Sequence, residues 1–324
     1  MIGRGYGRGC GAQSERGRYN LGVTRVKHFF SILVFPVVLA ASIAIGLYLM
    51  DSGLPPEESF GLLVFAAGLV VFGFERLLPH HGSWLHSRGD LGPDVGYLLG
   101  VGTPVALFVA PIAAFVGLSV LDWLSVRFGM DLWPTTWPLL AQLPLALVVA
   151  EFPKYWHHRL QHNNDFFWRF HATHHSAPRL YWLNATRFHP IDLFIDGLLG
   201  SIMLLAVGCP FEVLFLFLLV SGVHGFFQHA NLPLRCGPLN YFFSMAELHR
   251  WHHSKNIEEA NHNYGQNVII WDLVFGTFYL PKDREPPEDI GIPDLPAFPD
   301  TFWHQLASPF TWRRIKRESR ASSS

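Results

Sequence analysis

Charged residues are scarce in this chain. Asp, Glu, Lys and Arg make up 15% of its 324 residues, against about 25% in soluble domains. Half of the residues are hydrophobic, which excludes a disordered chain and a collagen-like one. The 24 Lys and Arg residues do not outnumber the 25 Asp and Glu residues. Binding of nucleic acid is therefore not expected, because no basic excess is available to neutralise its phosphates.

Cysteine is also rare, and several familiar motifs are missing. The three cysteines, Cys10, Cys209 and Cys236, are odd in number and lack metal-type spacing, so we expect free thiols. The sequence has no G-x-G-x-x-G fingerprint for dinucleotides and no H-E-x-x-H zinc motif. It also has no recognisable haem or iron–sulfur domain. A redox enzyme with this sequence would need electrons from a separate protein.

Long hydrophobic runs dominate the first half of the chain. Four of them are expected to be transmembrane helices, at residues 29–50, 60–74, 95–121 and 137–150. The first has 22 residues without a charge, which is enough to cross a bilayer. Two shorter runs, 193–207 and 213–223, meet at a Gly-Cys-Pro turn and could form a membrane-embedded hairpin. A soluble protein with buried core helices is the alternative, but the first and third runs are too long for it.

The charges that flank these runs predict an orientation. The first 28 residues contain six Lys and Arg against Glu15 alone, whereas loop 51–59 carries only acidic charges. The positive-inside rule then places the N-terminus in the cytoplasm. An even number of crossings and a basic C-terminal tail place the C-terminus there as well. The membrane would be a bacterial inner membrane or the endoplasmic reticulum. The Gly- and Arg-rich stretch before Tyr19 is expected to be disordered.

Histidine is abundant and clustered, with 13 of its 18 copies between His157 and His262. Three clusters have regular spacing: HRLQH at 158–162, HATHH at 171–175 and HRWHH at 249–253. On a helix, positions i, i+3 and i+4 share a face, so each cluster is expected to present its imidazoles to one point. Neutral imidazole is a good ligand for iron, zinc, copper or nickel. Eight such ligands exceed what one ion needs, so a two-metal centre fits the count better.

The remaining histidines are weaker candidates. We favour His229 as a further ligand over His224, because the two are five residues apart and share no helical face. His224 stays a reserve, and His189, His224 and His262 could support the ligands without binding metal. His157 points to a different helical face from His158 and is left out. Lone histidines are expected at the surface or in ordinary hydrogen bonds, and these are His28, His80, His81, His86 and His304.

Taken together, the motifs resemble the fatty acid hydroxylase/sterol desaturase superfamily of integral-membrane di-iron enzymes. They are HRLQH, HATHHS, the HP of RFHPID, QHAN, HRWHHS and WDLVFGTF. The match extends over about residues 151–281, roughly 40% of the chain. The resemblance implies an all-α transmembrane bundle under a histidine-rich cytoplasmic cap. It departs from some members at Gly225, where they have a histidine four residues before the counterpart of His229.

The resemblance also implies a metal centre and a reaction. Two non-haem irons would be held by His158, His162, His171, His174, His175, His229, His249, His252 and His253. Asn231 and Asp272 match recurrent motif positions and would have supporting roles. The enzyme would be an O2-dependent monooxygenase that hydroxylates or desaturates a lipid, such as a sterol or a fatty acyl chain. Its electrons would come from a ferredoxin or a b-type cytochrome with its reductase.

Metal-bound histidines usually donate their second ring N–H to a carboxylate or a carbonyl. Candidates by proximity in sequence are Glu151, Asp165, Asp192, Glu247 and Asp272. The expected organisation is a basic tail at 1–28, transmembrane helices at 29–150, the di-iron domain at 151–285 and a Pro-rich, then basic tail at 286–324.

Other functions fit the sequence less well. A membrane metal-binding or metal-transport protein without redox catalysis is the main alternative, yet transporters place ionisable residues inside their spans, and these spans have few. A zinc hydrolase would need a carboxylate within a histidine cluster as general base. A bis-histidine haem protein would not need eight clustered histidines.

Overall fold

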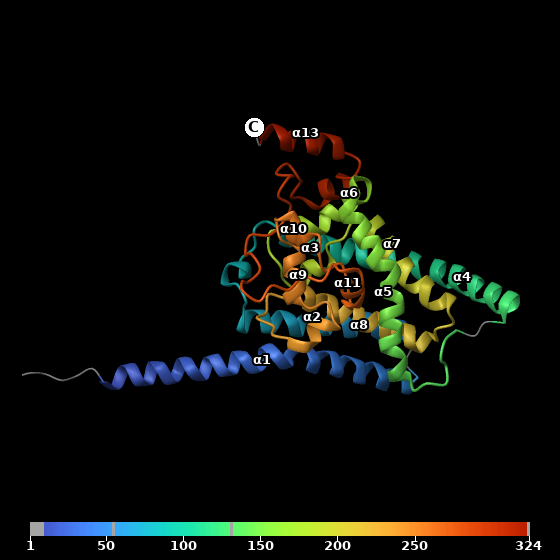
Figure 1. Cartoon of the computed structure of the whole chain (residues 1–324), viewed down its shortest axis with the longest axis horizontal. Coiled ribbons are helices and arrows are strands. Elements are labelled where there is room, and N and C mark those ends of the chain that lie inside the picture. The colour runs from blue at the N-terminus through green and yellow to red at the C-terminus, as the bar shows by residue number, and fades with distance from the viewer. Residues whose placement is uncertain (1–9, 54–55, 130–131, 323–324) are drawn as a thin grey trace, which may run out of the picture.

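The computed structural model describes residues 10–53, 56–129 and 132–322, and helices dominate it (Figure 1). The α-helices are α1 (Cys10–Asp51), α2 (Pro56–Leu77), α3 (Leu91–Tyr97), α4 (Thr103–Phe128), α5 (Leu139–Asn163), α6 (Asp165–His175), α7 (Pro190–Ala206), α8 (Phe211–His229), α9 (Ala246–His252), α10 (Ile257–Ala260), α11 (Ile270–Phe275), α12 (Phe302–Ala307) and α13 (Trp312–Ser322). Short turns of other helix types are η1 (Gly82–Leu85), η2 (Leu98–Gly102), η3 (Trp182–Thr186) and η4 (Gly237–Tyr241). Within the described ranges the only β-pairing is two isolated bridges, so the all-α prediction is confirmed.

Four helical stretches are long and apolar enough to cross a membrane. They are Lys27–Asp51 in α1, Ser59–Leu77 in α2, Leu91–Phe128 across α3 and α4, and Phe211–His229 in α8. Many large apolar side chains point outward from them; Leu62 is 71% exposed and Phe115 is 76% exposed. Water would disfavour so much exposed apolar surface, whereas lipid accommodates it. The chain is therefore an integral membrane protein.

The fourth stretch differs from the expected one. Residues 137–150 were predicted to span, but they enter the first half of α5, and that helix continues through buried Glu151 and Lys154 into the first histidine pair. Polar residues in its second half exclude α5 from the candidate spans, and α8 is a candidate instead. The sequence pattern was misread because the apolar run of α8 is short before its polar end at Gln228 and His229.

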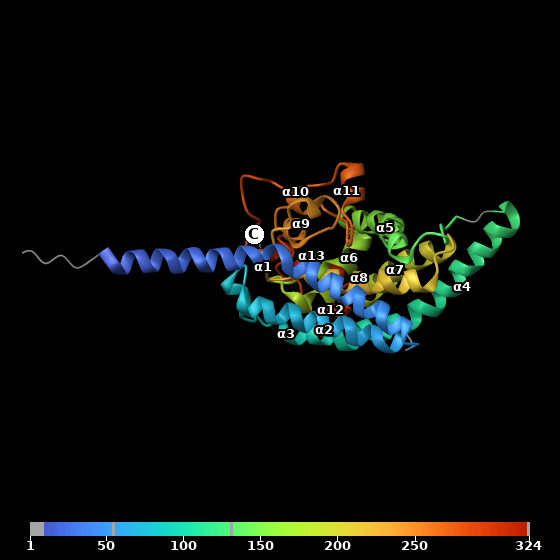
Figure 2. The same cartoon turned by 90° about the horizontal axis from the view of Figure 1, so that it is seen from below.

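Helix α8 is the central helix of the bundle. In the most apolar 18-residue segment of α8, 61% of the residues are buried inside the molecule, against 17–22% in the corresponding segments of the other three candidate spans. It packs against α1, α2, α5 and α9, and Figure 2 shows it between α2 and α5. Glycines allow this close approach: a Cβ at Gly46 of α1 would lie 2.8 Å from Leu219, and one at Gly222 would lie 3.0 Å from Val64 of α2. Small residues are common where membrane helices pack tightly.

The predicted turn between α7 and α8 forms, but the two helices separate after it. Gly208 has φ +87°, which suits glycine, and its N–H donates to the carbonyl of Leu205. Helix α7 then packs mainly against α4 and α5 rather than against α8. A Cβ at Gly117 of α4 would lie 2.6 Å from Leu205, so glycine permits the α4–α7 contact. The expected hairpin is therefore an open one.

The N-terminal region differs in part from its prediction. Helix α1 extends back to Cys10, into the stretch for which we expected disorder, because adding residues to an existing helix costs little once it is nucleated. Residues 1–9 and the side chain of Cys10 lie outside the described part of the chain. Cys209 and Cys236 are free and buried, as predicted.

The cap is built from the second half of α5, α6, η3 and α9 to α11, and the C-terminal segment covers one side of it. Trp312 and Ile315 of α13 pack with Leu295 against Ala172 of α6, where Trp168 joins them. Figure 1 shows α13 at the edge of the molecule farthest from α1. The C-terminal residues are thus part of the cap, close to the helix that carries the second histidine cluster.

Candidate metal centre

Nine histidines converge in the cap in two groups. The first group is His158, His162, His171, His175 and His252, and the second group is His174, His229, His249 and His253. Within each group, one ring nitrogen of every member lies within 4.8 Å of those of the others. These nine residues are the same nine that the sequence nominated as ligands. His229 belongs to the second group, whereas His224 belongs to neither.

The two groups share helices α6 and α9. In α6, His171 and His175 join the first group and His174 joins the second; in α9 and at its end, His249 and His253 join the second group and His252 joins the first. The expectation that each cluster serves one point holds for His158 and His162 and was wrong for the other two clusters. Adjacent residues point about 100° apart around a helix, whereas residues four apart differ by only about 40°. Consecutive histidines therefore separate, and the i, i+4 pairs stay together.

Local sequence explains how α6 presents its histidines. The side chain of Asn164 caps the helix by accepting from the N–H of Phe166 at 2.9 Å, as N-cap residues do. The helix ends after His175, and its last five residues are buried. Two turns are enough to place an i, i+3, i+4 set in the interior of the cap.

The distances between Nε2 atoms suit metal ions. They are 3.0 Å for His158 and His171, 3.1 Å for His162 and His175, 2.9 Å for His229 and His249, 3.0 Å for His249 and His253, and 3.2 Å for His174 and His253. Two ligand nitrogens about 2.1 Å from one ion and at right angles would be about 3.0 Å apart, whereas a tetrahedral arrangement would give about 3.4 Å. The spacing thus fits ions with five or six ligands.

Hydrogen bonds of the second ring nitrogen fix the tautomer of six of the nine histidines, whereas Nδ1 of His249 and of His253 is buried without a partner. His158 Nδ1 donates to the carbonyl of Tyr264 at 2.6 Å and His171 Nδ1 donates to Asp192 at 2.9 Å. Both Nε2 atoms of this pair therefore carry bare lone pairs that face each other, which is repulsive unless a cation lies between them. The other Nδ1 acceptors are Asn261 Oδ1 for His162, the Arg187 carbonyl for His174, Asn184 Oδ1 for His229 and the His262 carbonyl for His252.

Burial keeps the ligands neutral. Desolvation, and then the neighbouring histidines, lower the pKa of His171, His175 and His252 well below the ordinary value. For His158 burial lowers the pKa to about 4. Neutral imidazole is the form that binds metal. In addition, Nε2 of His252 is buried and has no hydrogen-bond partner, as expected for an atom that a metal would satisfy. The residues therefore fit the implied metals.

Asp272 supports the centre from one layer further out. Its carboxylate accepts from the N–H groups of Tyr264 and Gly265, both at 2.8 Å, and from Thr277 Oγ1 at 2.6 Å. These bonds hold the loop whose Tyr264 carbonyl orients His158. A Cβ at Gly265 would lie 2.3 Å from the Val268 carbonyl, so only glycine fits this loop.

The other supporting candidates have mixed outcomes. The side chain of Asn231 binds the backbone of His81, and its backbone N–H donates to Glu75. None of these contacts involves a histidine of either group. His189 caps α7 by accepting from Ile191 N–H. His224 packs against Phe35 and Phe243. His262 contributes its carbonyl rather than its ring. Apart from the groups lie the six histidines that the sequence excluded, His28, His80, His81, His86, His157 and His304.

Among the nominated carboxylates, only Asp192 contacts a ligand. Glu151 accepts from the backbone N–H groups of Gln266 and Asn267, and Asp165 binds Trp312 and Lys316. Glu247 binds the Cys236 N–H and Asn240. The sequence did not reveal Asn184, Asn261 or the three backbone carbonyls, because such acceptors carry no motif.

Comparison with known proteins agrees with this geometry. A profile of the fatty acid hydroxylase family matches residues 143–277. Ornithine lipid hydroxylase OlsE of Rhizobium tropici is 36% identical over 289 residues, which cover 89% of this chain and 86% of that protein. The chain belongs to the fatty acid hydroxylase family. It is thus a membrane-bound, O2-dependent enzyme that oxidises lipids, and its histidine groups could hold metal.

More distant relatives match a smaller part of the chain. Alkylglycerol monooxygenase of Xenopus tropicalis is 28% identical over 54% of this chain and 39% of its own length. Sphinganine C4-monooxygenase 2 of Arabidopsis thaliana is 28% identical over 45% of this chain and 57% of its own length. No solved structure matches the chain.

Proposed function

We propose that the protein is a non-haem di-iron monooxygenase that hydroxylates a membrane lipid, with ornithine lipid as the first substrate to test. The convergence of nine neutral histidines into groups of five and four carries this proposal. Iron is favoured over zinc, because zinc has no redox chemistry and its structural sites close with four ligands. The relatives are named as hydroxylases and monooxygenases, which favours hydroxylation over desaturation.

The nine histidines would hold the two irons, which supply the reduction of O2 and the cleavage of a C–H bond that side-chain acid–base chemistry cannot achieve. The protein's own contribution is to keep each ligand neutral, oriented and dry. Phe188 stacks on His174 with ring centroids 4.2 Å apart. Trp168 contacts the rings of His162 and His175 with centroids 5.1 and 5.2 Å away. These aromatic side chains restrict access of water from the cap.

The reaction needs an external reductant. Conversion of C–H and O2 to C–OH and water consumes two electrons and two protons. Helix α13 suits the docking of an acidic one-electron carrier, such as a ferredoxin or a b-type cytochrome that its reductase recharges. Its buried face carries Trp312 and Ile315, and its exposed face carries Arg313, Arg314, Arg317 and Arg320. Because Trp312 packs beside Trp168, this surface lies next to ligands of the first group.

Orientation is the second part of the proposal. The positive-inside rule supports a cytoplasmic location for both termini and for the cap. The exposed face of α13 carries no large apolar side chain, so it suits an acidic protein better than insertion into lipid. A green fluorescent protein fused to the C-terminus should fluoresce, as cytoplasmic fusions do, and loss of fluorescence at normal expression would contradict this orientation.

Metal analysis of the purified protein tests the di-iron proposal. We expect about two irons per chain in the wild type. His174→Ala and His252→Ala should each retain about one, because each variant removes a ligand from a different group. His86→Ala is the control, since His86 is exposed and outside both groups. Zinc after overexpression would require reconstitution with ferrous iron under argon. Failure to bind iron in any preparation would reject the di-iron proposal.

Activity is a separate measurement. The iron-loaded protein should add one oxygen atom from isotopically labelled O2 to ornithine lipid in the presence of a reducing system, and mass spectrometry detects the label in the lipid. Label in water alone would mean that O2 is reduced without lipid oxidation and would reject this substrate.

A further inference from the structure

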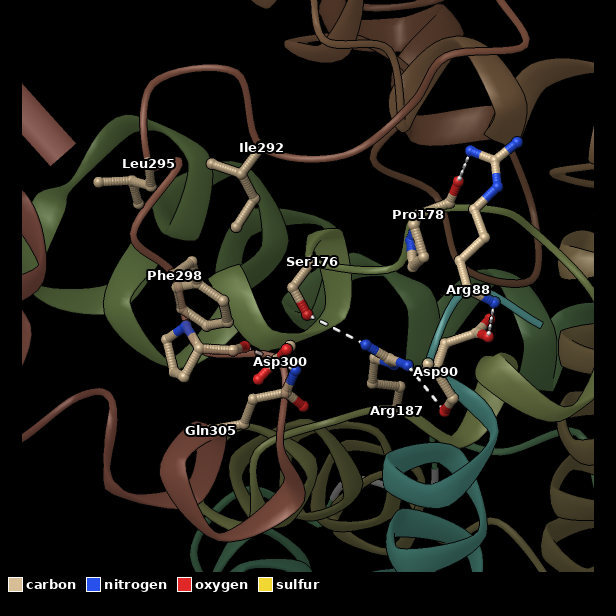
Figure 3. A pocket seen from close by; sticks show the side chains of 12 residues that line it. Arg88, Asp90, Ser176, Pro178, Arg187, Ile292, Leu295, Phe298, Asp300 and Gln305 are labelled. Carbon is tan, nitrogen blue, oxygen red and sulfur yellow. Dashed lines mark hydrogen bonds between the residues drawn. The ribbon is translucent and has the colours of Figure 1, made fainter. Parts of the chain in front are cut away.

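A pocket of about 220 Å³ lies beside the metal centre, between the loop before α3 and the C-terminal segment 292–305 (Figure 3). Ser176, which follows the ligand His175, forms part of its wall. Asp90 also lines the pocket and directly precedes Leu91, where a candidate membrane span begins. The stretch that begins at Leu91 has 38 residues, more than the roughly 20 that cross a bilayer. Part of it therefore extends beyond the hydrocarbon, and the pocket lies on the side of the cap.

Two of the four charged residues that line the pocket are neutralised by neighbours. Arg179 Nε donates to Asp90 at 2.6 Å, and Arg187 Nε donates to Asp94 at 2.5 Å. The other two are Arg88 and Asp300, and neither has an ion-pair partner within the described ranges. The side chain of Arg88 donates one hydrogen bond, from Nη1 to the Pro178 carbonyl at 3.1 Å. The pocket thus offers one unpaired cation and one unpaired anion.

A buried acceptor adds to the anionic side. Gln305 is 1% exposed, and its Oε1 has no hydrogen-bond partner. The amide cannot be flipped, because Nε2 donates to the Pro299 carbonyl at 3.0 Å. Asp300 and Gln305 both line the pocket (Figure 3). Unsatisfied buried acceptors are rare in proteins and call for a donor.

We propose that this pocket binds a zwitterionic lipid head group. A primary ammonium would donate to Asp300 and to Gln305 Oε1, and an acid group of the same head would pair with Arg88. Ile292 and Phe298, on the wall opposite Arg88 in Figure 3, would contact the methylene groups. This chemistry is shared by amino-acid lipids, which have a carboxylate, and by phosphoethanolamine lipids, which have a phosphate. The assignment of the bound lipid as substrate rests on the proposed function, but binding itself needs no metal.

The test is a matrix of variants and lipids, measured as dissociation constants by native mass spectrometry on metal-free protein in detergent. The variants are Asp300→Asn and Arg88→Gln. The control Asp294→Asn alters an exposed carboxylate of the same segment that does not line the pocket. The lipids are ornithine lipid, its amine-acetylated form, its carboxyl methyl ester and phosphatidylethanolamine. Thermal unfolding of each variant checks that it is folded.

The two charges should couple to different ends of the head group. Asp300→Asn should weaken the binding of ornithine lipid about tenfold, as expected for loss of one charge-assisted hydrogen bond. It should not affect the binding of the acetylated form. Arg88→Gln should weaken the binding of ornithine lipid by a similar factor and should not affect the binding of the methyl ester. Phosphatidylethanolamine shows whether a phosphate replaces the carboxylate, and its dependence on Asp300 should be the same.

A further variant examines the buried acceptor. Gln305→Leu should weaken the binding of ornithine lipid and leave the binding of the acetylated form unchanged, as expected for Asp300→Asn. Equal affinities in wild type and all variants would overturn the pocket. Equal losses for blocked and unblocked lipids would also overturn it, because they would indicate non-specific surface electrostatics. If binding follows the expected pattern but no lipid is hydroxylated, the proposed function fails and the pocket stands.

Discussion

The hydrogen bond between Asp192 and His171 gives a sharp prediction about the metals. Asp192 is 3% exposed, and its carboxylate accepts from both His171 Nδ1 and Gln161 Nε2. Asp192→Asn retains the shape but leaves only one acceptor oxygen, so one of the two partners loses its bond. Loss of such a partner typically lowers metal affinity about 10- to 100-fold.

The expected loss is confined to one ion. Since His171 belongs to the first group, Asp192→Asn should weaken the iron held there and leave the iron of the second group at its wild-type affinity. Titration of ferrous iron against a chelator of known affinity should show two phases, of which only one shifts. Mössbauer spectra of the half-loaded variant should show a single type of iron.

A matched control separates metal affinity from stability. Glu247 makes comparable bonds, to the Cys236 N–H at 2.8 Å and to Asn240 at 2.7 Å, but it contacts no ligand. Glu247→Gln should lower the melting temperature without a shift in either iron phase. Equal weakening of both irons in Asp192→Asn, or the same effect in Glu247→Gln, would refute the assignment of Asp192 to one group.

Two further predictions concern the loop behind His158 and the surface of α13. Gly265→Ala should destabilise the fold by about 1–3 kcal/mol and weaken iron binding, because its Cβ would lie 2.3 Å from the Val268 carbonyl and displace Tyr264; an unchanged melting temperature would contradict this packing. Arg314→Glu combined with Arg317→Glu should raise the KM for a reduced acidic ferredoxin and remove its dependence on salt, while turnover with a small chemical reductant stays the same. An unchanged KM would reject α13 as the docking site.

The histidines that converge could be predicted because their spacing is a local property. His158 and His162, or His171 and His175, are brought together by one helix, and the helix repeat is known in advance. The division of the clusters between two groups is not local, because it depends on how α5, α6 and α9 face one another. The nine histidines do converge, but the arrangement predicted for His174 and His252 was wrong.

Other features could not be read from the sequence at all. The acceptors of His158 and His174 are the backbone carbonyls of Tyr264 and Arg187, and every residue has a carbonyl. Likewise α8 became the central helix because of close contacts at glycines such as Gly222, which involve partners far away in the chain. Hydropathy ranks runs by composition and does not report which of them the others surround.

The sharing of α6 and α9 between the two groups separates chemistry from substrate choice. Neighbouring residues such as His174 and His175 belong to different groups, so the covalent geometry of one helical turn sets how far apart the two groups are. The head-group pocket is built largely from the loop before α3 and the C-terminal segment, which supply none of the nine ligands. Mutations there can change which lipid is bound while the spacing of the metals stays fixed.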